Sequence, residues 1–391
     1  MKIKRELSKK LKDLAKYFPV LAILGPRQSG KTTLAINTFK NYKYISLEEP
    51  RNKEIATVDP KAFIETHKDT PGLILDEIQE SPILLSYIQA HVDLNNKPGF
   101  FVITGSHNFL LNEKISQTLA GRVAICTLLP LSINEIMTVK KNISLDQIIF
   151  NGSYPRLYAT GASPLDLYPP YIKTYVERDV RQITNITDLI TFQRFIGLCA
   201  GRIGQILNLT SLANDCGVTI ATAKSWISIL AASYIIFLLQ PHYKNFNKRL
   251  IKSPKIYFYD TGLACSILGI ESQEQLFTHY IRGNLFESFI ISELYKQRYN
   301  LGKEPRLYFW RDKTGHEIDC VIENGQELMT IEAKAGKTFS QNMIDGLLYW
   351  NTLAKTKLPY KNSFLIYGGH EDYKTNTANI ISWKSLNKIL N

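Results

Sequence analysis

Gly25-Pro26-Arg27-Gln28-Ser29-Gly30-Lys31-Thr32 decides the fold of this chain, because it places a glycine, four variable positions and Gly-Lys-Thr between two apolar segments. Residues 20–24 before it and 33–36 after it predict a buried strand that turns into a helix. A phosphate-binding loop requires this context, whereas an ordinary glycine turn does not explain the Lys and the Thr. Backbone N–H groups of the turn would bind the β- and γ-phosphates, Lys31 would add a positive charge, and Thr32 would bind Mg²⁺.

The phosphate loop therefore predicts a nucleotide and Mg²⁺ as cofactors. The residues expected to contact the nucleotide are Gly25, Pro26, Arg27, Gln28, Ser29, Gly30, Lys31, Thr32 and Thr33.

Two carboxylates follow the apolar residues 72–75, namely Asp76 and Glu77. In a parallel sheet the carboxyl end of this strand lies beside the phosphate loop. We therefore predict that Asp76 helps to hold Mg²⁺ and that Glu77 polarises the attacking water. Acids at the end of a strand are common, and it is the preceding phosphate loop that favours a catalytic role here.

A further apolar segment, residues 100–103, ends in Thr104 and Ser106. We expect this strand to lie between the two strands just described, which would bring small polar groups close to a γ-phosphate or to the attacking water. Thr104 and Ser106 are therefore predicted to sense the nucleotide. Alternating strands and helices of this kind predict a parallel sheet with helices on both faces.

Length and composition describe a globular protein of more than one domain. The 391 residues exceed the usual size of one core, and 45% of them are hydrophobic. The net charge of +12 favours a polyanionic partner, either nucleic acid or an anionic membrane surface. Five cysteines without CxxC spacing are typical of reduced thiols, and no segment has the length and apolarity of a membrane span or a signal peptide. We therefore predict a cytoplasmic protein outside the membrane.

The motifs together resemble one family. The phosphate loop, the Asp-Glu pair, the Thr-Gly-Ser strand and the segments 119–122 and 129–132 resemble the AAA+ ATPase domain of the widespread prokaryotic family with a C-terminal domain of unknown function, DUF4143. The resemblance implies that Arg122 reaches a γ-phosphate in its own chain or in a neighbouring subunit of a homo-oligomer. A structural ion pair is the alternative role for Arg122. Since no Asn-Lys-x-Asp motif is present, ATP is preferred over GTP.

The middle of the chain predicts a helix-turn-helix. Within residues 209–226, a short helix with Thr210 as its expected N-cap, a turn at Gly217 and a second helix with Thr219 as its expected N-cap form this layout, and residues 235–239 are expected to form a wing strand. A basic cluster that could bind phosphates follows the wing. Its members are Lys244, Lys248, Arg249, Lys252 and Lys255. Winged helices also bind proteins, so the partner of this unit stays open at this stage.

The C-terminal part predicts a hairpin with an acidic face. An Asn-Gly turn at residues 324–325 separates two apolar segments, which predicts that Asp319 and Glu332 stand on adjacent strands with Lys334 on the face of Glu332. Two carboxylates near a lysine can bind Mg²⁺, and Glu287 could supply a third acid. The arrangement resembles the PD-(D/E)xK restriction-endonuclease-like fold, although Ile318 replaces the usual Pro. An exposed hairpin with unrelated charges is the alternative.

These observations predict an α/β protein with three parts: an AAA+ P-loop ATPase core with a parallel sheet at 1–150, a helical and winged-helix segment at 151–265, and a nuclease-like α/β domain at 266–391. The expected function is a Mg²⁺-dependent ATPase that couples nucleotide state to the binding of nucleic acid, most simply DNA, with nuclease activity left open. A signalling or scaffold ATPase whose C-terminal domains bind protein is the alternative.

Overall fold

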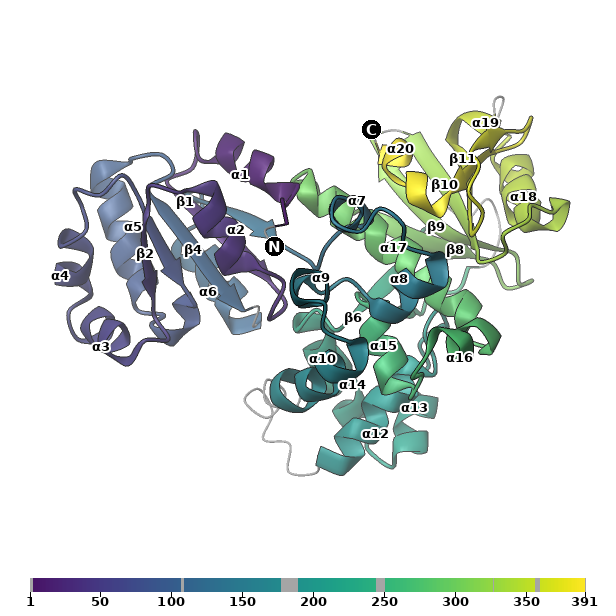
Figure 1. Ribbon diagram of the computed structural model, residues 1–391, viewed down its shortest axis with the longest axis horizontal. Coiled ribbons are helices and arrows are strands. Elements are labelled where there is room, and N and C mark those ends of the chain that lie inside the picture. Colours follow the sequence, from purple (N-terminus) through teal and green to yellow (C-terminus); the bar gives the residue numbers. More distant parts are fainter. Residues whose placement is uncertain are drawn as a thin grey trace. The chain divides into compact units, whose positions relative to one another are not determined.

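The computed structural model describes residues 3–106, 109–176, 189–243, 250–325, 327–355 and 359–390 (Figure 1). The chain forms two compact units. The first consists of Met1–Leu131 with the short segments Ala232–Tyr234 and Tyr299–Lys303, and the second contains the remainder. No helix in the described part of the chain is long and apolar enough to cross a membrane.

The first unit contains a five-stranded parallel sheet in the order β2-β3-β4-β1-β5. Its strands are β1 Val20–Gly25, β2 Lys43–Ser46, β3 Leu73–Asp76, β4 Phe101–Ser106 and β5 Val123–Thr127. Strand β4 lies between β3 and β1, which confirms the position predicted for the Thr-Gly-Ser strand. The carboxyl ends of β1, β3 and β4 therefore meet at one edge of the sheet.

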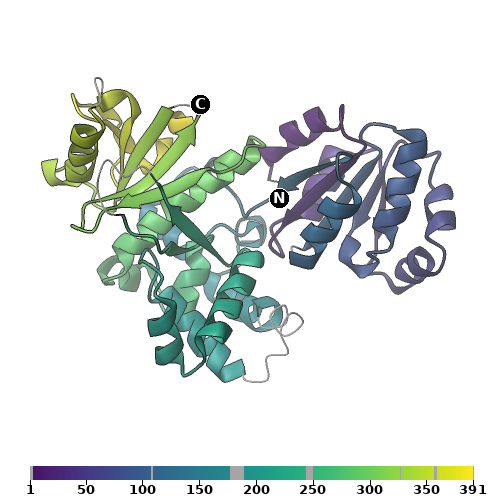
Figure 2. The same ribbon diagram turned by 180° about the vertical axis from the view of Figure 1, so that it is seen from behind.

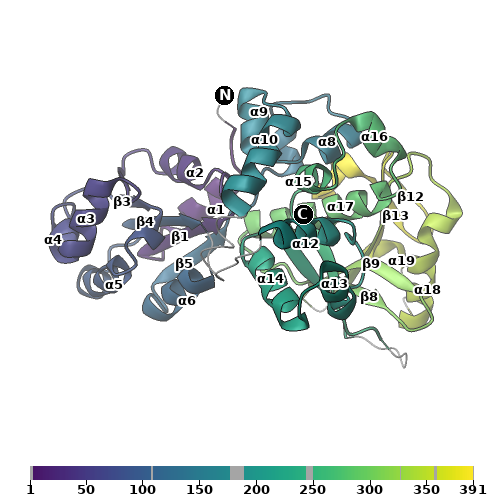
Figure 3. The same cartoon turned by 90° about the horizontal axis from the view of Figure 1, so that it is seen from below.

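Helices cover both faces of this sheet, as Figures 1 and 3 show. They are α1 Leu7–Leu14, α2 Lys31–Thr38, α3 Pro50–Val58, α4 Pro60–Glu65, the short helix Ile78–Glu80, α5 Leu84–Asn95 and α6 Phe109–Thr118. Alternate residues of β1 enter opposite cores: Ala22 packs with α4 and α5, whereas Ile23 packs with α1 and α2. This alternation explains why β1 reads as a continuous apolar run rather than an alternating one.

The second unit contains an eight-stranded mixed sheet in the order β12-β13-β11-β10-β9-β8-β6-β7. Its strands are β6 Ile236–Pro241, β7 Lys255–Phe258, β8 Leu307–Arg311, β9 Glu317–Asn324, β10 Glu327–Lys334, β11 Ser363–Tyr367, β12 Tyr373–Lys374 and β13 Asn379–Ser382. Strands β9 and β10 form the predicted antiparallel hairpin, with Gly325 in the left-handed conformation.

Along the chain, the helices of the second unit come before, between and after the strands of this sheet (Figure 2). They are α7 Ile133–Met137, α8 Leu145–Asn151, α9 Pro155–Thr160, α10 Pro164–Tyr171 with the π-helical turn Ile172–Val176, α12 Leu189–Ala200, α13 Leu209–Cys216, α14 Ile220–Ala232, α15 Thr261–Ile267, α16 Gln273–Thr278, α17 Arg282–Asn300, the 3₁₀ turns Gln341–Ile344 and Trp383–Ser385, α18 Asp345–Ala354, α19 Pro359–Asn362 and α20 Asn387–Leu390.

Helices α13 and α14 lie where the two helices of this segment were predicted, with Gly217 in the left-handed conformation between them. The backbone N–H of Thr222 donates to the Thr219 hydroxyl, as predicted for the second cap. The first cap was predicted wrongly. Asn208 caps α13 by accepting from the N–H of Ser211, because the helix already begins at Leu209.

The predicted wing strand has a second role in the sheet. Strand β6 pairs with β7 on one side, and its residues Gln240 and Pro241 pair with β8 on the other. Residues from the predicted middle part thus continue the sheet of the predicted C-terminal part. The boundaries at residues 150 and 265, and the winged-helix interpretation itself, remain predictions.

A buried polar network joins helices that are distant in sequence within the second unit. The Asp260 carboxylate accepts from the Ser153 N–H and hydroxyl at 2.7 and 2.8 Å and from the Tyr168 hydroxyl at 2.7 Å. Lys296 Nζ donates to Ser153 Oγ at 3.0 Å and to Glu293 Oε1 at 2.6 Å. Since these groups are buried, their mutual bonds replace the water that they lose on folding.

Candidate functional sites

The phosphate loop joins the end of β1 to the start of α2 and needs glycine at both ends. A Cβ at Gly25 would lie 2.2 Å from the Leu128 carbonyl oxygen, and Gly30 has φ of 93°. Only glycine adopts these conformations at little cost. The helix that follows begins at Lys31, so its first N–H groups open toward the loop.

Polar groups inside the loop fit a phosphate. Lys31 is 5% exposed and its Nζ donates to the carbonyls of Gly25 and Pro26 at 3.2 and 2.9 Å. Ser29 is fully buried, and its hydroxyl has no hydrogen-bond partner within the described part of the chain. A phosphate oxygen would satisfy such a donor. Thr33, also predicted to bind nucleotide, is exposed on the first turn of α2.

The two residues predicted to hold Mg²⁺ are brought together. The Thr32 hydroxyl lies 2.9 Å from Asp76 Oδ1, and the Thr104 hydroxyl also donates to Asp76. Tyr44, which the sequence analysis missed, donates to Asp76 Oδ2 at 3.0 Å from the neighbouring strand β2. Burial and the Asp76 charge raise the pKa of Tyr44 to about 12. A hydroxyl and a carboxylate are the oxygen ligands that Mg²⁺ prefers.

Glu77 is held at the end of β3 in a left-handed conformation with φ of 56°. Its Oε2 accepts from the N–H and hydroxyl of Ser106 at 3.1 and 3.2 Å and from the Gln79 amide. Burial raises the pKa of Glu77, but the Lys31 charge and these hydrogen bonds outweigh it and leave the pKa below its usual value. The lowered pKa favours the ionised carboxylate, and the hydrogen bonds hold it in one orientation.

The second site is an acid pocket of about 720 Å³ in the second unit. It is lined by Gly204, Lys255, Glu287, His316, Glu317, Asp319, Glu332, Lys334, Asn342, Met343, Asp345, Gly346, Leu348, Tyr349 and Thr352. The pocket therefore contains all four residues predicted for a nuclease-like site.

The hairpin brings three of these four together. Lys334 Nζ lies 2.6 Å from Glu332 Oε2 and 3.3 Å from Asp319 Oδ2, and the Ala333 N–H donates to Asp319 at 2.9 Å. Gly346 in the first turn of α18 leaves room for Glu332, since a Cβ there would lie 2.3 Å from Glu332 Oε1. Burial and the Asp319 charge raise the pKa of Glu332. Burial raises the pKa of Asp319 too, but Lys334 and Lys255 lower it overall.

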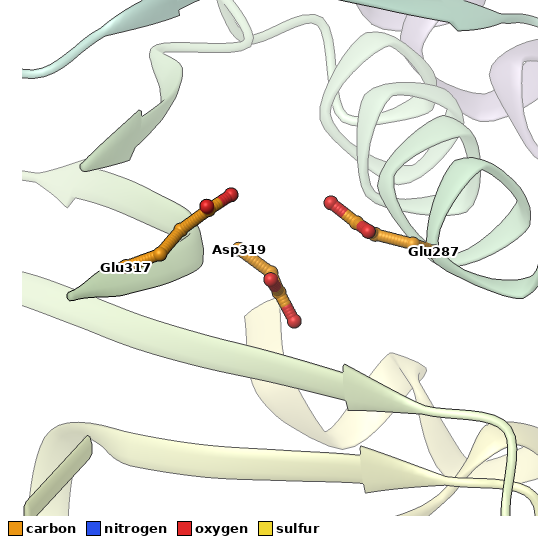
Figure 4. Close-up of side chains that lie close together, drawn as sticks. All are labelled: Glu287, Glu317 and Asp319. Atoms are coloured by element: carbon orange, nitrogen blue, oxygen red, sulfur yellow. The ribbon is translucent and has the colours of Figure 1, made fainter. Parts of the chain in front are cut away.

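Glu287 enters the same pocket from α17, together with a residue that the sequence analysis missed. Figure 4 shows Glu287 on the helix and Glu317 on a strand, with Asp319 near both. One carboxylate oxygen from each of these three residues lies within 4.8 Å of the other two. Burial raises the pKa of Glu287 to about 7, although the nearby Lys255 charge lowers it. The signal for Glu317 was its spacing, because residues 317 and 319 share one face of β9.

Family models match the two parts of the chain that contain most residues of these sites. An AAA domain model matches residues 17–137, and a model of a domain of unknown function, DUF4143, matches residues 282–386. The chain combines an AAA domain with a C-terminal DUF4143 domain. A second domain of unknown function, DUF8612, matches residues 142–274 between them.

Similar proteins span most of the chain. Two uncharacterized proteins, from Mycobacterium bovis and Mycobacterium tuberculosis, are each 29% identical over 325 residues, which cover 82% of this chain and 71% of theirs. Among solved structures, a Walker-type ATPase of Pyrococcus abyssi matches with 14% identity and a TM-score of 0.46, covering 69% of this chain and 96% of its own. The RuvB Holliday junction branch migration motor of Thermotoga maritima matches with 18% identity and a TM-score of 0.31, covering 60% and 89%.

Arg122 of the AAA domain lies away from the phosphate loop of its own chain. Its carbonyl accepts from the N–H of Val20, at the start of β1, whereas the loop follows the end of β1. The side chain forms an ion pair with Asp93, with Nε–Oδ1 and Nη2–Oδ2 distances of 2.5 and 2.9 Å. Reaching the γ-phosphate of its own chain is therefore a wrong prediction. The ion pair is the alternative stated above, and a role toward a neighbouring subunit remains a proposal.

One residue of the predicted basic cluster is also corrected. Lys255 is 3% exposed and pairs with Glu287 and Glu317 inside the acid pocket, so it is not a surface contact for phosphates. Lys252 is exposed, as predicted for a phosphate contact. Lys244, Lys248 and Arg249 lie outside the described residues.

Arg5 supports the phosphate loop of the AAA domain from behind and was not predicted. Its guanidinium is buried and donates from Nη1 to the Ser29 carbonyl at 2.6 Å and from Nη2 to the Leu129 carbonyl at 2.7 Å. The donor in both hydrogen bonds is the charged guanidinium, which makes them stronger than hydrogen bonds between neutral groups. Arg5 therefore ties the phosphate loop to the segment that follows β5.

Arg5→Ala is expected to weaken ATP binding about tenfold, because the loss of hydrogen bonds to a charged group costs about 1.5 to 3 kcal/mol. Titration with a fluorescent ATP analogue measures this. Lys9→Ala is the matched control, since Lys9 is exposed on the following helix α1. This variant should bind ATP with the affinity of the parent. Equal affinity in Arg5→Ala and Lys9→Ala would contradict a supporting role for Arg5.

Proposed function

We propose that this chain is a Mg²⁺-dependent ATPase that uses its nucleotide state to control the binding of nucleic acid at the acid pocket of its DUF4143 domain. The AAA domain match supports nucleotide binding. The observation that carries the hydrolytic part is the meeting of Thr32, Asp76 and Glu77 beside the phosphate loop.

The residues of the AAA domain divide the work of hydrolysis. Lys31 and the N–H groups of the loop bind the phosphates, and Thr32 with Asp76 would hold Mg²⁺, which supplies charge neutralisation to the phosphate oxygens. Glu77 orients the attacking water and accepts its proton. Ser106 fixes the Glu77 carboxylate, and Thr104 fixes Asp76, so these two residues act through the acids.

The acid pocket supports the nucleic-acid part of the proposal. Glu287, Asp319 and Glu332 converge with Lys334 in one cavity, a donor set that fits a divalent cation beside a phosphodiester. The net charge of +12 adds a general attraction to polyanions. Exposed Lys224 on α14 and Lys252 before β7 offer phosphate contacts on the helix-turn-helix and its wing. We further propose a cytoplasmic protein that acts as a homo-oligomer, in which Arg122 of one subunit can face a neighbouring phosphate loop.

The affinity for DNA is expected to fall by about a hundredfold or more between 50 and 200 mM salt, since each phosphate contact releases counterions. Fluorescence anisotropy of a labelled duplex measures this, with and without a non-hydrolysable ATP analogue. A change in affinity with the analogue would support the coupling.

The double variant Lys224→Ala with Lys252→Ala should make the slope of log affinity against log salt concentration shallower by about two. The control is the double variant Lys9→Ala with Lys12→Ala, which removes two lysines of α1. A protein without salt-dependent DNA affinity would instead favour the scaffold ATPase.

A further inference from the structure

Lys255 places an ammonium group among the acids of the pocket, and the proposed function leaves it without a role. Its side chain is 4% exposed, and Nζ lies 3.0 Å from Glu287 Oε1 while also pairing with Glu317. The Tyr257 hydroxyl donates to the same Glu287 oxygen. Burying an ammonium group is costly unless it is paired, so the two carboxylates hold Lys255 in place.

The acids around Lys255 have the geometry of a cation site. Oxygens of Glu287, Glu317 and Asp319 lie within 4.8 Å of one another, which one divalent ion with metal–oxygen distances of about 2.0 to 2.6 Å can span. Figure 4 shows these three side chains without the lysine. The ammonium of Lys255 touches two of the three acids and therefore lies where the ion would bind.

Lys334 and Arg311 differ from Lys255 in exposure and in contacts. Lys334 is 38% exposed and pairs with Asp319 and Glu332. Arg311 is 37% exposed, pairs with Glu317 at 3.2 Å and is absent from the residues that line the pocket. Lys255 is therefore the cation whose removal would leave a gap between Glu287 and Glu317.

We propose that Lys255 is a built-in counter-ion that takes the place of a divalent cation among Glu287, Glu317 and Asp319. A cation can bind there only when the Lys255 ammonium leaves, so the free protein holds the cation weakly and Glu317 becomes one of its ligands. This inference rests on the proposed cation site of the acid pocket. It adds the element that regulates that site.

Mn²⁺ binding to the full-length protein tests the inference, measured by calorimetry and by electron paramagnetic resonance. Every variant also carries Asp76→Asn, which removes the acid of the AAA domain's own cation site. Lys255→Met should bind Mn²⁺ at least about tenfold more tightly than this parent, because a nearby positive charge is lost and its place is vacated. Adding Asp319→Asn should abolish the gain.

Arg311→Met is the matched control. It removes a positive charge from Glu317 but leaves Lys255 in place, and because its charge is screened by solvent, affinity should change less than about threefold. An affinity of Lys255→Met equal to or weaker than that of the parent would overturn the inference. So would a gain as large in Arg311→Met, or a gain that persists with Asp319→Asn.

Thermal unfolding covers the case in which Lys255→Met folds poorly. The variant leaves the carboxylates of Glu287 and Glu317 facing each other without the lysine. Without Mn²⁺ its melting temperature should therefore be lower than that of the parent, and with Mn²⁺ it should rise more than that of the parent. A variant that stays unfolded with and without Mn²⁺ would overturn the inference, because Lys255 would then be a structural group that no ion replaces.

The failure of this inference can be told apart from the failure of the proposed function. If Asp319→Asn weakens Mn²⁺ binding by the parent but Lys255→Met brings no gain, the cation site stands and the role of Lys255 falls. If no variant binds Mn²⁺ in a way that depends on Asp319, the cation site and the inference both fall.

Discussion

Glu77→Gln is expected to slow ATP hydrolysis by about two to four orders of magnitude while ATP binding stays within a few-fold of the parent. Glutamine keeps the size of the side chain and can still accept from the Ser106 N–H, which lies 3.1 Å from Glu77 Oε2. It cannot accept a proton from water. The phosphate loop is untouched, because Gly25–Thr32 lies on a different strand and helix.

Single-turnover hydrolysis and nucleotide titration measure the two effects separately. Lys31→Ala should differ from Glu77→Gln in that ATP binding is weakened as well, because the charge beside the β- and γ-phosphates is gone. Glu80→Gln is the matched control, since this acid follows Glu77 closely in the sequence but forms an ion pair with Lys53, with an Nζ–Oε2 distance of 2.6 Å. Hydrolysis at the parental rate in both Glu77→Gln and Lys31→Ala would refute the ATPase assignment.

The sequence predicted most of the AAA domain because its signals are local. The phosphate loop, the apolar strands and the acids at the end of β3 each lie within a few residues of one another, and the strand order follows from how such units pack. Helix α3 was not predicted, because only Ala56 of Pro50–Val58 is buried and the segment has no apolar periodicity. Tyr44 was missed because its contact with Asp76 joins two strands.

The acid pocket shows the same limit more clearly. The hairpin and the pair of Asp319 and Glu332 could be predicted from the Asn-Gly turn and from the alternation of each strand. Lys255 could not, because it follows a run of lysines and arginines that describes a solvated surface. Lys255 meets Glu287 because β7 packs against α17, where Phe258 exchanges hydrogen bonds with Ser288, and that packing is a tertiary contact.

If the acid pocket hydrolyses phosphodiesters, as its donor set suggests, Asp319→Ala is expected to lower the rate of Mg²⁺-dependent DNA cleavage by at least about a thousandfold. Asp319 belongs both to the cluster of three acids with Glu287 and Glu317 and to the ion pairs of Lys334. It lies within 4.8 Å of oxygens of Glu287 and Glu317, and 3.3 Å from Lys334 Nζ. Its loss removes a cation ligand and leaves Lys334 with Glu332 alone.

Cleavage of a labelled duplex with Mg²⁺ or Mn²⁺, with an EDTA control, measures this effect. Glu323→Gln is the matched control, because Glu323 lies on the same strand β9 but pairs with His242 and does not line the pocket. Cleavage that persists in Asp319→Ala would exclude the pocket as its source. If the parent binds DNA but cuts none under any of these conditions, the pocket is a binding site, and Asp319→Ala should then change the dependence of DNA affinity on Mg²⁺ instead of a rate.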